Sequence, residues 1–272
     1  MPRTSACPKH GENLMTEPME VSTNASRRRV ANGLYGKAVR PAVESSAAQV
    51  AQGSPSTQKV YAIIGPDGSG KTTIARVIAA RLAEAGIRTR IAWMRSPRIV
   101  TLGVIGILRL ARLAKTVRVG DHDDVHIDLK RHPLLLHLYA WSITFDYFLG
   151  YFGKVTIPRR LLRRTVICDR FAWDTLVDLG LTSGLDEGFL DFPQGRILLD
   201  LAKKHGGVLV IASPEELLRR RPILSLDPRL PRRLRLYAEL AARFGLGTVD
   251  SGNTSESLSA SKAAEYLGIP AE

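Results

Sequence analysis

Short apolar runs alternate with longer amphipathic segments from Lys59 onward. Runs rich in β-branched and aliphatic residues, bounded by turn residues, are typical of buried strands, and they cover residues 59–64, 88–94, 164–169, 206–212 and 246–250. Helical segments lie between them, notably 71–85, 134–149, 214–221, 229–244 and 254–267. Strands that alternate with helices predict a parallel sheet covered on both faces, and hence an α/β fold.

The first 58 residues show no such periodicity. They are rich in Ser, Ala, Thr, Asn, Pro and Gly, with one basic cluster at Arg27, Arg28 and Arg29. We interpret residues 1–58 as a disordered basic extension, and 59–272 as one domain. The basic cluster is either a solvated part of this extension or a nucleic-acid or targeting patch.

Charge and cysteine content narrow the class of partner and the compartment. The formal net charge of +13 favours anionic partners such as nucleotides, nucleic acid or acidic lipid. Two cysteines, Cys7 and Cys168, make a disulfide framework unexpected, and no apolar signal-peptide region is visible. A cytoplasmic protein is expected, with Cys168 as a core residue of its strand.

A phosphate-binding loop follows the first strand and opens the first helix. Residues 65–72 match the pattern G-x-x-x-x-G-K-[ST], whose glycines let backbone N–H groups turn toward phosphate oxygens. Lys71 is predicted to reach the β- and γ-phosphates, and the Thr72 hydroxyl to hold Mg²⁺. The predicted ATP-binding residues are Gly65, Pro66, Asp67, Gly68, Ser69, Gly70, Lys71, Thr72 and Thr73.

Several motifs together resemble the thymidylate kinase family. They are, in chain order, "GPDGSGKTT", "WMRSP", "VICDRFAWD", "IASPEELLRRR" and "VDSGNTSESLSASKAAEYLG", and they span most of residues 59–268. The resemblance implies a P-loop NTPase three-layer sandwich with a five-stranded parallel sheet and an arginine-bearing lid. It also implies phosphorylation of dTMP, or of a related nucleoside monophosphate, by ATP with Mg²⁺, and a possible homodimer.

The same resemblance assigns roles to residues beyond the loop. Asp169 ends a strand and would support Mg²⁺, while Arg170 would hold the acceptor phosphate. Asp67 would face the acceptor sugar. Arg95 is the candidate for a second arginine on the acceptor phosphate, with Arg98 as its alternative.

The lid is expected in the helix that begins at Pro214. This helix ends in Arg219, Arg220 and Arg221, and Arg220 matches best the lid arginine that would cover the β- and γ-phosphates. The alternative interpretation is a solvated charged face.

The helix that reads the base in the family departs from its pattern. If Tyr139 takes the place of the family's Phe, Ile143 stands where the family has Arg. No arginine occurs between His132 and Lys154. Because a site built around a polar contact discriminates strongly against ligands that lack it, another nucleotide or a non-nucleotide phosphate also stays open as the acceptor.

Three further segments allow more than one interpretation. Residues 102–115 are apolar with Arg109, Arg112 and Lys115, and we expect them to pack on the sheet rather than on an anionic membrane. Residues 134–153 read as a buried core helix rather than a transmembrane span, because Asp146 would be costly at a bilayer centre. Residues 120–132, with four Asp and three His, are expected to form a polar loop rather than a metal site.

A rival class is an ATP-dependent nucleic-acid-binding protein, which the positive charge favours. The sequence lacks the interleaved aromatic and basic residues of a stacking groove. It also has no second carboxylate beside Asp169 to poise a hydrolytic water. A kinase of nucleotide substrates is therefore preferred, and nucleic acid is not expected as a partner.

Overall fold

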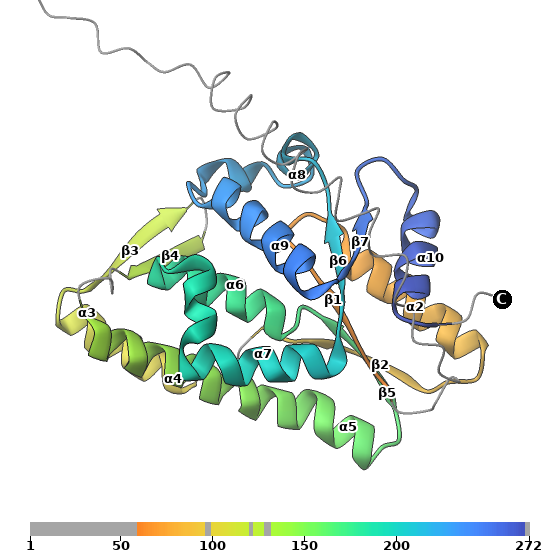
Figure 1. Ribbon diagram of the computed structural model, residues 1–272, viewed down its shortest axis with the longest axis horizontal. Coiled ribbons are helices and arrows are strands. Elements are labelled where there is room, and N and C mark those ends of the chain that lie inside the picture. Colours follow the sequence, from red (N-terminus) through yellow and green to blue (C-terminus); the bar gives the residue numbers. More distant parts are fainter. Residues whose placement is uncertain (1–58, 96–98, 120–121, 128–131, 270–272) are drawn as a thin grey trace, which may run out of the picture.

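The five predicted strands form one parallel sheet. The computed structural model describes residues 59–269 except 96–98, 120–121 and 128–131, and it does not describe the side chains of residues 114–131. The sheet runs in the order β2-β5-β1-β6-β7 (Figure 1). Its strands are β1 (Val60–Ile64), β2 (Thr89–Trp93), β5 (Thr165–Asp169), β6 (Val208–Ile211) and β7 (Gly247–Asp250).

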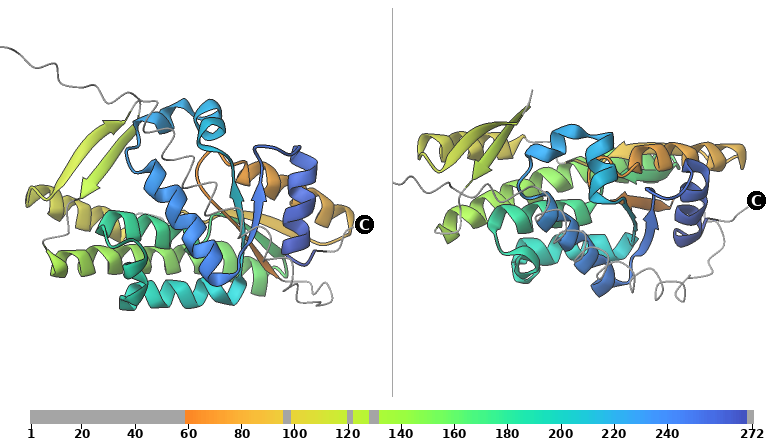
Figure 2. Two further views of the ribbon diagram at one scale, coloured as in Figure 1. Left: turned by 45° about the horizontal axis from the view of Figure 1, so that its top comes forward. Right: turned by 90° about the horizontal axis from the view of Figure 1, so that it is seen from above.

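Helices cover both faces of this sheet, as Figure 2 shows from two further sides. One face packs against α2 (Lys71–Glu84) and α10 (Glu256–Tyr266), and the other against a larger set. That set contains α4 (Pro133–Tyr151), α6 (Ala172–Ser183), α7 (Pro193–His205) and α9 (Leu230–Phe244). Successive residues of β1 serve opposite layers, because Ala62 and Ile64 belong to one core cluster and Tyr61 and Ile63 to the other. The three-layer α/β sandwich predicted from the sequence is therefore confirmed.

Shorter elements complete the described chain. They are α3 (Val100–Leu110), β3 (Ala114–Val119), β4 (His122–Ile127), η2 (Phe152–Thr156), α5 (Ile157–Arg160), η3 (Asp186–Asp191), α8 (Pro214–Arg220) and η4 (Pro222–Leu226). Helices α6 and α7 were not among the predicted helices. The proposed extension over 1–58 lies outside the described residues, whereas Cys168 is buried in β5 as expected.

Two expectations for the segment after β2 are wrong. Residues 122–127 form strand β4, which pairs antiparallel with β3, so the expected polar loop is largely a hairpin. The side chains of its Asp and His residues lie outside the described part. Helix α3 packs on α4 and not on the sheet: Val104, Ile105 and Leu108 cluster with Leu136. Because other helices already cover that face of the sheet, the apolar side of α3 packs on α4 instead.

A buried carboxylate on α4 holds the start of α3. The side chain of Asp146 is fully buried and accepts hydrogen bonds from the backbone N–H groups of Val100 (3.0 Å) and Thr101 (2.9 Å). An acceptor with negative charge satisfies the unpaired N–H groups of a first helical turn and complements its dipole. Asp146, whose charge made a membrane span unexpected from the sequence, thus caps the N-terminus of α3 from the neighbouring helix α4.

Replacing Asp146 by alanine should destabilise the protein by about 2 kcal/mol, since the buried N–H of Thr101 and the partly buried N–H of Val100 would lose their acceptor. Chemical denaturation measures the change, and Asp146→Asn is the control because its amide oxygen can still accept one bond. An alanine variant as stable as the parent would contradict the capping role.

Helix α4 is buried on one face only. Tyr147 is fully buried, and Phe148 and Tyr151 pack against the same core. The opposite face exposes large apolar side chains, so the prediction of a wholly buried core helix is wrong for that face. In the part of the chain that the structure describes, no helix is both long and apolar enough to cross a bilayer.

Candidate active site

A cavity opens at the carboxyl ends of β1, β2 and β5, where parallel α/β sheets bind their ligands. Its volume is about 620 Å³. It is lined by Asp67, Gly68, Gly70, Lys71, Thr72, Thr73, Ile74, Trp93, Arg95, Asp169, Arg170, Arg219, Arg220, Arg221, Ser251, Thr254, Glu256 and Ser259. The structure therefore brings together the predicted phosphate loop, the end of β5, Arg95 and the arginines of α8.

The loop between β1 and α2 requires glycine for steric reasons. A Cβ atom at Gly65 would lie 2.2 Å from the carbonyl oxygen of Val210, and the φ angle there is +138°. Gly68 and Gly70 also adopt positive φ, at 84° and 86°, which side-chain-bearing residues rarely adopt. The bare loop brings backbone N–H groups and the N-terminus of α2 to one place, and such an arrangement binds phosphate.

Lys71 occupies the floor of this loop. Its side chain is 5% exposed, and Nζ donates a hydrogen bond of 2.5 Å to the carbonyl oxygen of Pro66. Burial lowers the pKa of Lys71, while the nearby carboxylates of Asp174 and Asp169 raise it. The ammonium group is thus held beside the loop by acceptors that a polyphosphate can replace.

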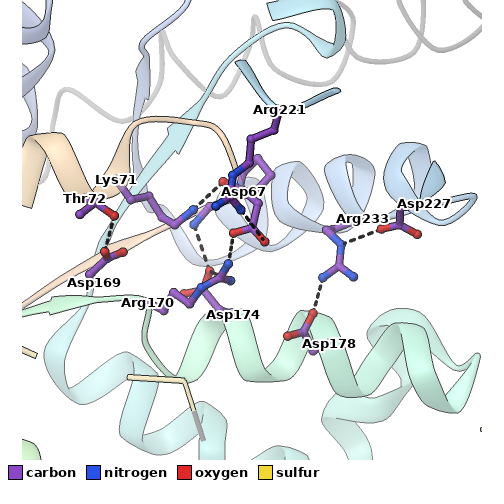
Figure 3. A network of polar contacts seen from close by, with 12 residues as sticks. Asp67, Lys71, Thr72, Asp169, Arg170, Asp174, Asp178, Arg221, Asp227 and Arg233 are labelled. Atoms are coloured by element: carbon purple, nitrogen blue, oxygen red, sulfur yellow. Dashed lines mark hydrogen bonds and ion pairs between the residues drawn. The ribbon is translucent and has the colours of Figure 1, made fainter. Parts of the chain in front are cut away.

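Thr72 and Asp169 place two hard oxygen donors side by side. The Thr72 hydroxyl donates to Asp169 Oδ2 over 2.5 Å, and Asp169 is itself 5% exposed. Oxygen donors next to a phosphate loop fit Mg²⁺, which is commonly bound through one or two protein oxygens, substrate phosphate and water. This corner, drawn in Figure 3, has the chemistry that a magnesium site needs.

Arg170 follows β5 and turns back toward the loop. Its guanidinium pairs with the Asp67 carboxylate and lies 3.9 Å from Asp174 Oδ1 (Figure 3). Arg221 approaches the other oxygen of Asp67, at 3.8 Å. Arg170 also has a φ angle of +72°, a sparsely populated conformation for a residue with a side chain, and such outliers cluster at functional sites.

Asp174 is a site residue to which the sequence reasoning gave no role. Its buried carboxylate accepts hydrogen bonds from the N–H of Gly65 (3.2 Å), the N–H of Phe171 (2.8 Å) and the hydroxyl of Tyr237 (2.7 Å). Burial raises the pKa of Asp174, while Arg170, Lys71 and the hydrogen bond from Tyr237 oppose that shift. The first residue of the phosphate loop, the start of α6 and helix α9 are therefore tied to one carboxylate.

The sequence contained a local signal for Asp174. An acidic residue at the third position of a helix commonly bonds back to the helix start, and Asp174 stands three residues after Phe171. That signal predicts the bond to Phe171 only. The bonds to Gly65 and Tyr237 depend on how β1, α6 and α9 meet. Beyond this carboxylate, Arg233 of α9 pairs with Asp178 of α6 and lies 3.7 Å from Asp227 (Figure 3).

The three arginines at the end of α8 point to different partners. Arg219 is 74% exposed and pairs with Glu216. Arg220 also bonds Glu216, but its guanidinium reaches the carbonyl oxygens of Gly68 (3.3 Å) and Ser251 (2.8 Å). Of the two arginines within α8, Arg220 is therefore the one that reaches the phosphate loop, while Arg221, just beyond the helix, approaches the loop at Asp67.

Ser251 connects the loop to α8, and the sequence analysis missed it. Its hydroxyl lies 2.8 Å from the carbonyl oxygen of Ser69 and 3.1 Å from that of Ile211, and it accepts from Arg220 at 3.0 Å. The short polar segment after β7 thus fixes the position of Arg220.

The predicted acceptor residues separate into two groups. Arg95 lines the cavity together with Arg170 and Asp67, and so does the half-exposed Trp93 at the end of β2. Tyr139, in contrast, is not in the cavity lining; it packs against the hydrophobic core beside α3. Arg98 lies outside the described residues.

A histidine lies behind Phe171, the residue that follows Arg170. His205 Nε2 is 2.8 Å from the Tyr151 hydroxyl, and the His205 and Phe171 rings meet edge to face with centroids 5.6 Å apart. Burial, with Arg159 and Lys204, lowers the pKa of His205 to about 4.

This lowered pKa predicts acid sensitivity. The pKa of His205 is about 6.5 in the unfolded chain and about 4 in the folded protein. Between these two pH values the unfolded state binds more protons than the folded state, so the free energy of unfolding decreases as the pH falls. Thermal melts from pH 7 to pH 4 should show a shallower decline for His205→Gln than for the parent chain. Parallel slopes for the two proteins would show that His205 does not contribute.

The sheet, the glycine loop and the cavity together define an α/β protein with a P-loop NTPase fold. No known protein-family profile matches the chain, and no curated protein matches it. Among solved structures, the thymidylate kinase of Ehrlichia chaffeensis is similar to 78% of this chain over 99% of its own, with 16% identity and a TM-score of 0.43. A likeness of that degree says nothing about activity, so the functional inference rests on the site.

Proposed function

We propose that the protein transfers the γ-phosphoryl group of ATP to a phosphate-bearing acceptor, with dTMP or a related nucleoside monophosphate as the first candidate. The observation that supports this most is the arrangement of one cavity. The phosphate loop and Lys71 form one side of it, and Arg170 and Arg95 contribute separate positive charge to the same space. A phosphoryl-transfer site needs two anions held in line and their charge neutralised.

Each side chain has a part in this proposal. The loop amides and Lys71 bind the ATP phosphates, and Arg220 neutralises charge at the β- and γ-phosphates from across the loop mouth. Arg170 exchanges its bond to Asp67 for the acceptor phosphate, and Arg95 assists it. Asp67, once released, accepts a hydrogen bond from an acceptor hydroxyl.

Thr72 and Asp169 would hold Mg²⁺, which when bound neutralises phosphate charge as a Lewis acid. Asp169 also orients the Thr72 hydroxyl, because the two are hydrogen-bonded. The setting we expect is cytoplasmic.

A second candidate keeps the chemistry and changes the acceptor. Tyr139, the expected base-stacking residue, packs into the core rather than lining the cavity, and Ile143 also packs there. The described cavity therefore contains arginines that could hold a phosphate, but not Tyr139, the residue expected to read a base. This favours a non-nucleotide phosphate as the alternative acceptor.

An ADP-release assay with a panel of nucleoside monophosphates and sugar phosphates tests the proposal. We expect stimulation by at least one monophosphate acceptor. ATP turnover that no acceptor stimulates, or turnover stimulated only by DNA or RNA, would contradict it. Thermal shift with each acceptor, with and without ATP, separates the two candidates, because a ligand that binds the folded state raises its stability.

Separate alanine substitutions of Arg220 and of its neighbour Arg219 test the lid role proposed for Arg220. Arg220→Ala should lower kcat about 100-fold with little change in stability, because its charge acts on the transferring phosphate. Arg219→Ala, one residue away and mostly exposed, should change kcat less than about threefold. Equal effects of the two substitutions would mean that the arginines form only a charged surface.

A further inference from the structure

The outward face of α4, continued by the first residue of η2, forms a stripe of large apolar side chains, which we call the α4 stripe. Leu134, Phe145 and Phe152 are 80%, 59% and 58% exposed, and Leu138, Trp141 and Leu149 are between 45% and 46% exposed. At about 100° per residue all six fall within about 80° of the helix circumference. No charged residue interrupts the stripe, and α4 lies at the edge of the molecule in Figure 1.

Helix α3 widens this apolar surface. It runs antiparallel to α4, because its first turn is bonded by Asp146 while Leu108 packs near Leu136 at the other end. Leu102, Ile107 and Leu110 of α3 are 61%, 58% and 87% exposed. With aromatic side chains of about 150–250 Å² each, the roughly half-exposed Trp141, Phe145 and Phe152 alone present on the order of 300 Å², and the Leu and Ile side chains add to it. Patches of this size mark protein or membrane contacts.

Positive charge borders the stripe at both ends. Arg109 and Arg112 lie where α3 ends, beside the start of α4. At the other end Lys154 lies in η2, and four arginines follow within α5 and residues 161–164, where Leu161 is 74% exposed between Arg160 and Arg163. Across α3, α4, η2, α5 and residues 161–164 the one acidic residue is Asp146, and it is buried. The hairpin aspartates are among the undescribed side chains, so this statement concerns the helical surface.

We propose that this surface, made of the α4 stripe, the outer side of α3 and the basic residues at both ends, binds an anionic phospholipid membrane. Apolar and aromatic side chains flanked by Lys and Arg lie at the boundary between headgroups and acyl chains, and anionic lipid attracts the basic flanks. A second copy of this chain fits less well. Pairing of α4 with itself in either direction brings a basic end against a basic end.

Flotation of the full chain with lipid vesicles tests the proposal. Binding to vesicles of phosphatidylcholine with phosphatidylglycerol is expected, with much weaker binding to phosphatidylcholine alone and a decline as salt rises. Tryptophan emission should shift to the blue on binding. Trp141→Phe should remove most of that shift while binding persists, since Trp173 is already buried and Trp93 lines the cavity rather than this surface.

Two variants divide the apolar and basic contributions. The double variant Trp141→Ser with Phe145→Ser should reduce partitioning onto anionic vesicles about 100-fold. The double variant Arg160→Gln with Arg164→Gln should reduce it about 30-fold. All four side chains are exposed, so folding should be unaffected and circular dichroism checks it. Arg76→Gln/Lys262→Gln removes the same charge from exposed sites on α2 and α10, over the other face of the sheet, and should leave partitioning unchanged.

Three outcomes would overturn the proposal. They are no binding to anionic vesicles, equal losses in the control variant, and a lipid-insensitive dimer that Phe145→Ser dissociates. The last would assign the stripe to a second copy, and sedimentation equilibrium detects it. None of these measurements depends on kinase activity.

Discussion

Replacement of Lys71 by alanine should reduce phosphoryl transfer at least about 1000-fold. The side chain is buried at the floor of the phosphate loop with its ammonium against the Pro66 carbonyl. Its removal would leave an empty space there, and the negative charge of a bound polyphosphate would no longer be neutralised. Preorganised charge at the transferring phosphate provides a large part of catalysis in such sites. Steady-state ADP release with the best acceptor measures the loss.

The loss must be separated from unfolding. Lys71→Ala should melt within a few degrees of the parent chain, because the Lys71 ammonium bonds a carbonyl of its own loop and burial already disfavours its charge. Lys262→Ala, on exposed α10, is the control for removal of one lysine and should keep full activity. A Lys71→Ala protein that is folded and retains more than about a tenth of the activity would rule out the phosphate-binding role.

Asp174→Ala should produce the largest loss of stability, about 3 kcal/mol. The substitution leaves two backbone N–H groups and the Tyr237 hydroxyl without their acceptor, and it removes one of the carboxylates beside Arg170 and Lys71. Unsatisfied buried donors cost about 1–3 kcal/mol each before relaxation. Chemical denaturation at neutral pH measures the change.

Tyr237→Phe provides the comparison for Asp174. It removes one of the three hydrogen bonds and keeps the ring, so its cost should be about 1 kcal/mol. If Asp174→Ala costs no more than Tyr237→Phe, the bonds to Gly65 and Phe171 contribute little. In that case the carboxylate is not what holds the loop to α6 and α9.

The predictions that the structure confirms rest on local patterns. The five strands and the glycine loop were visible because apolar runs and the G-x-x-x-x-G-K-T spacing constrain their own neighbours. The predicted strand boundaries differ from those observed by no more than two residues, for example 88–94 against Thr89–Trp93. The hairpin β3–β4 was missed because residues 120–132 are mostly polar, and the alternation of Val125, Ile127 and Leu129 is too short to stand out beside the Asp and His cluster.

The candidate active site also has one part that could be predicted from the sequence and one part that could not. The position of the loop and the end of β5 followed from sequence, since a carboxylate at a parallel strand end points to the ligand crevice. The bond between Asp67 and Arg170, the bonds from Gly65 and Tyr237 to Asp174, and the link from Ser251 to Arg220 join residues 31 to 109 positions apart. No local pattern specifies such pairs.

The sequence by itself determined the α/β class, the phosphate loop and the places where its strands end, because each follows from periodicity or steric demands within a few residues. Only the tertiary structure decided which arginine of α8 crosses the loop, that Tyr139 packs into the core, and that one face of α4 has no cover within the described residues. Those outcomes depend on which helix lies beside which. The physical reason is that an apolar side chain can be buried against any neighbour, and a sequence states that it is apolar without stating which neighbour it meets.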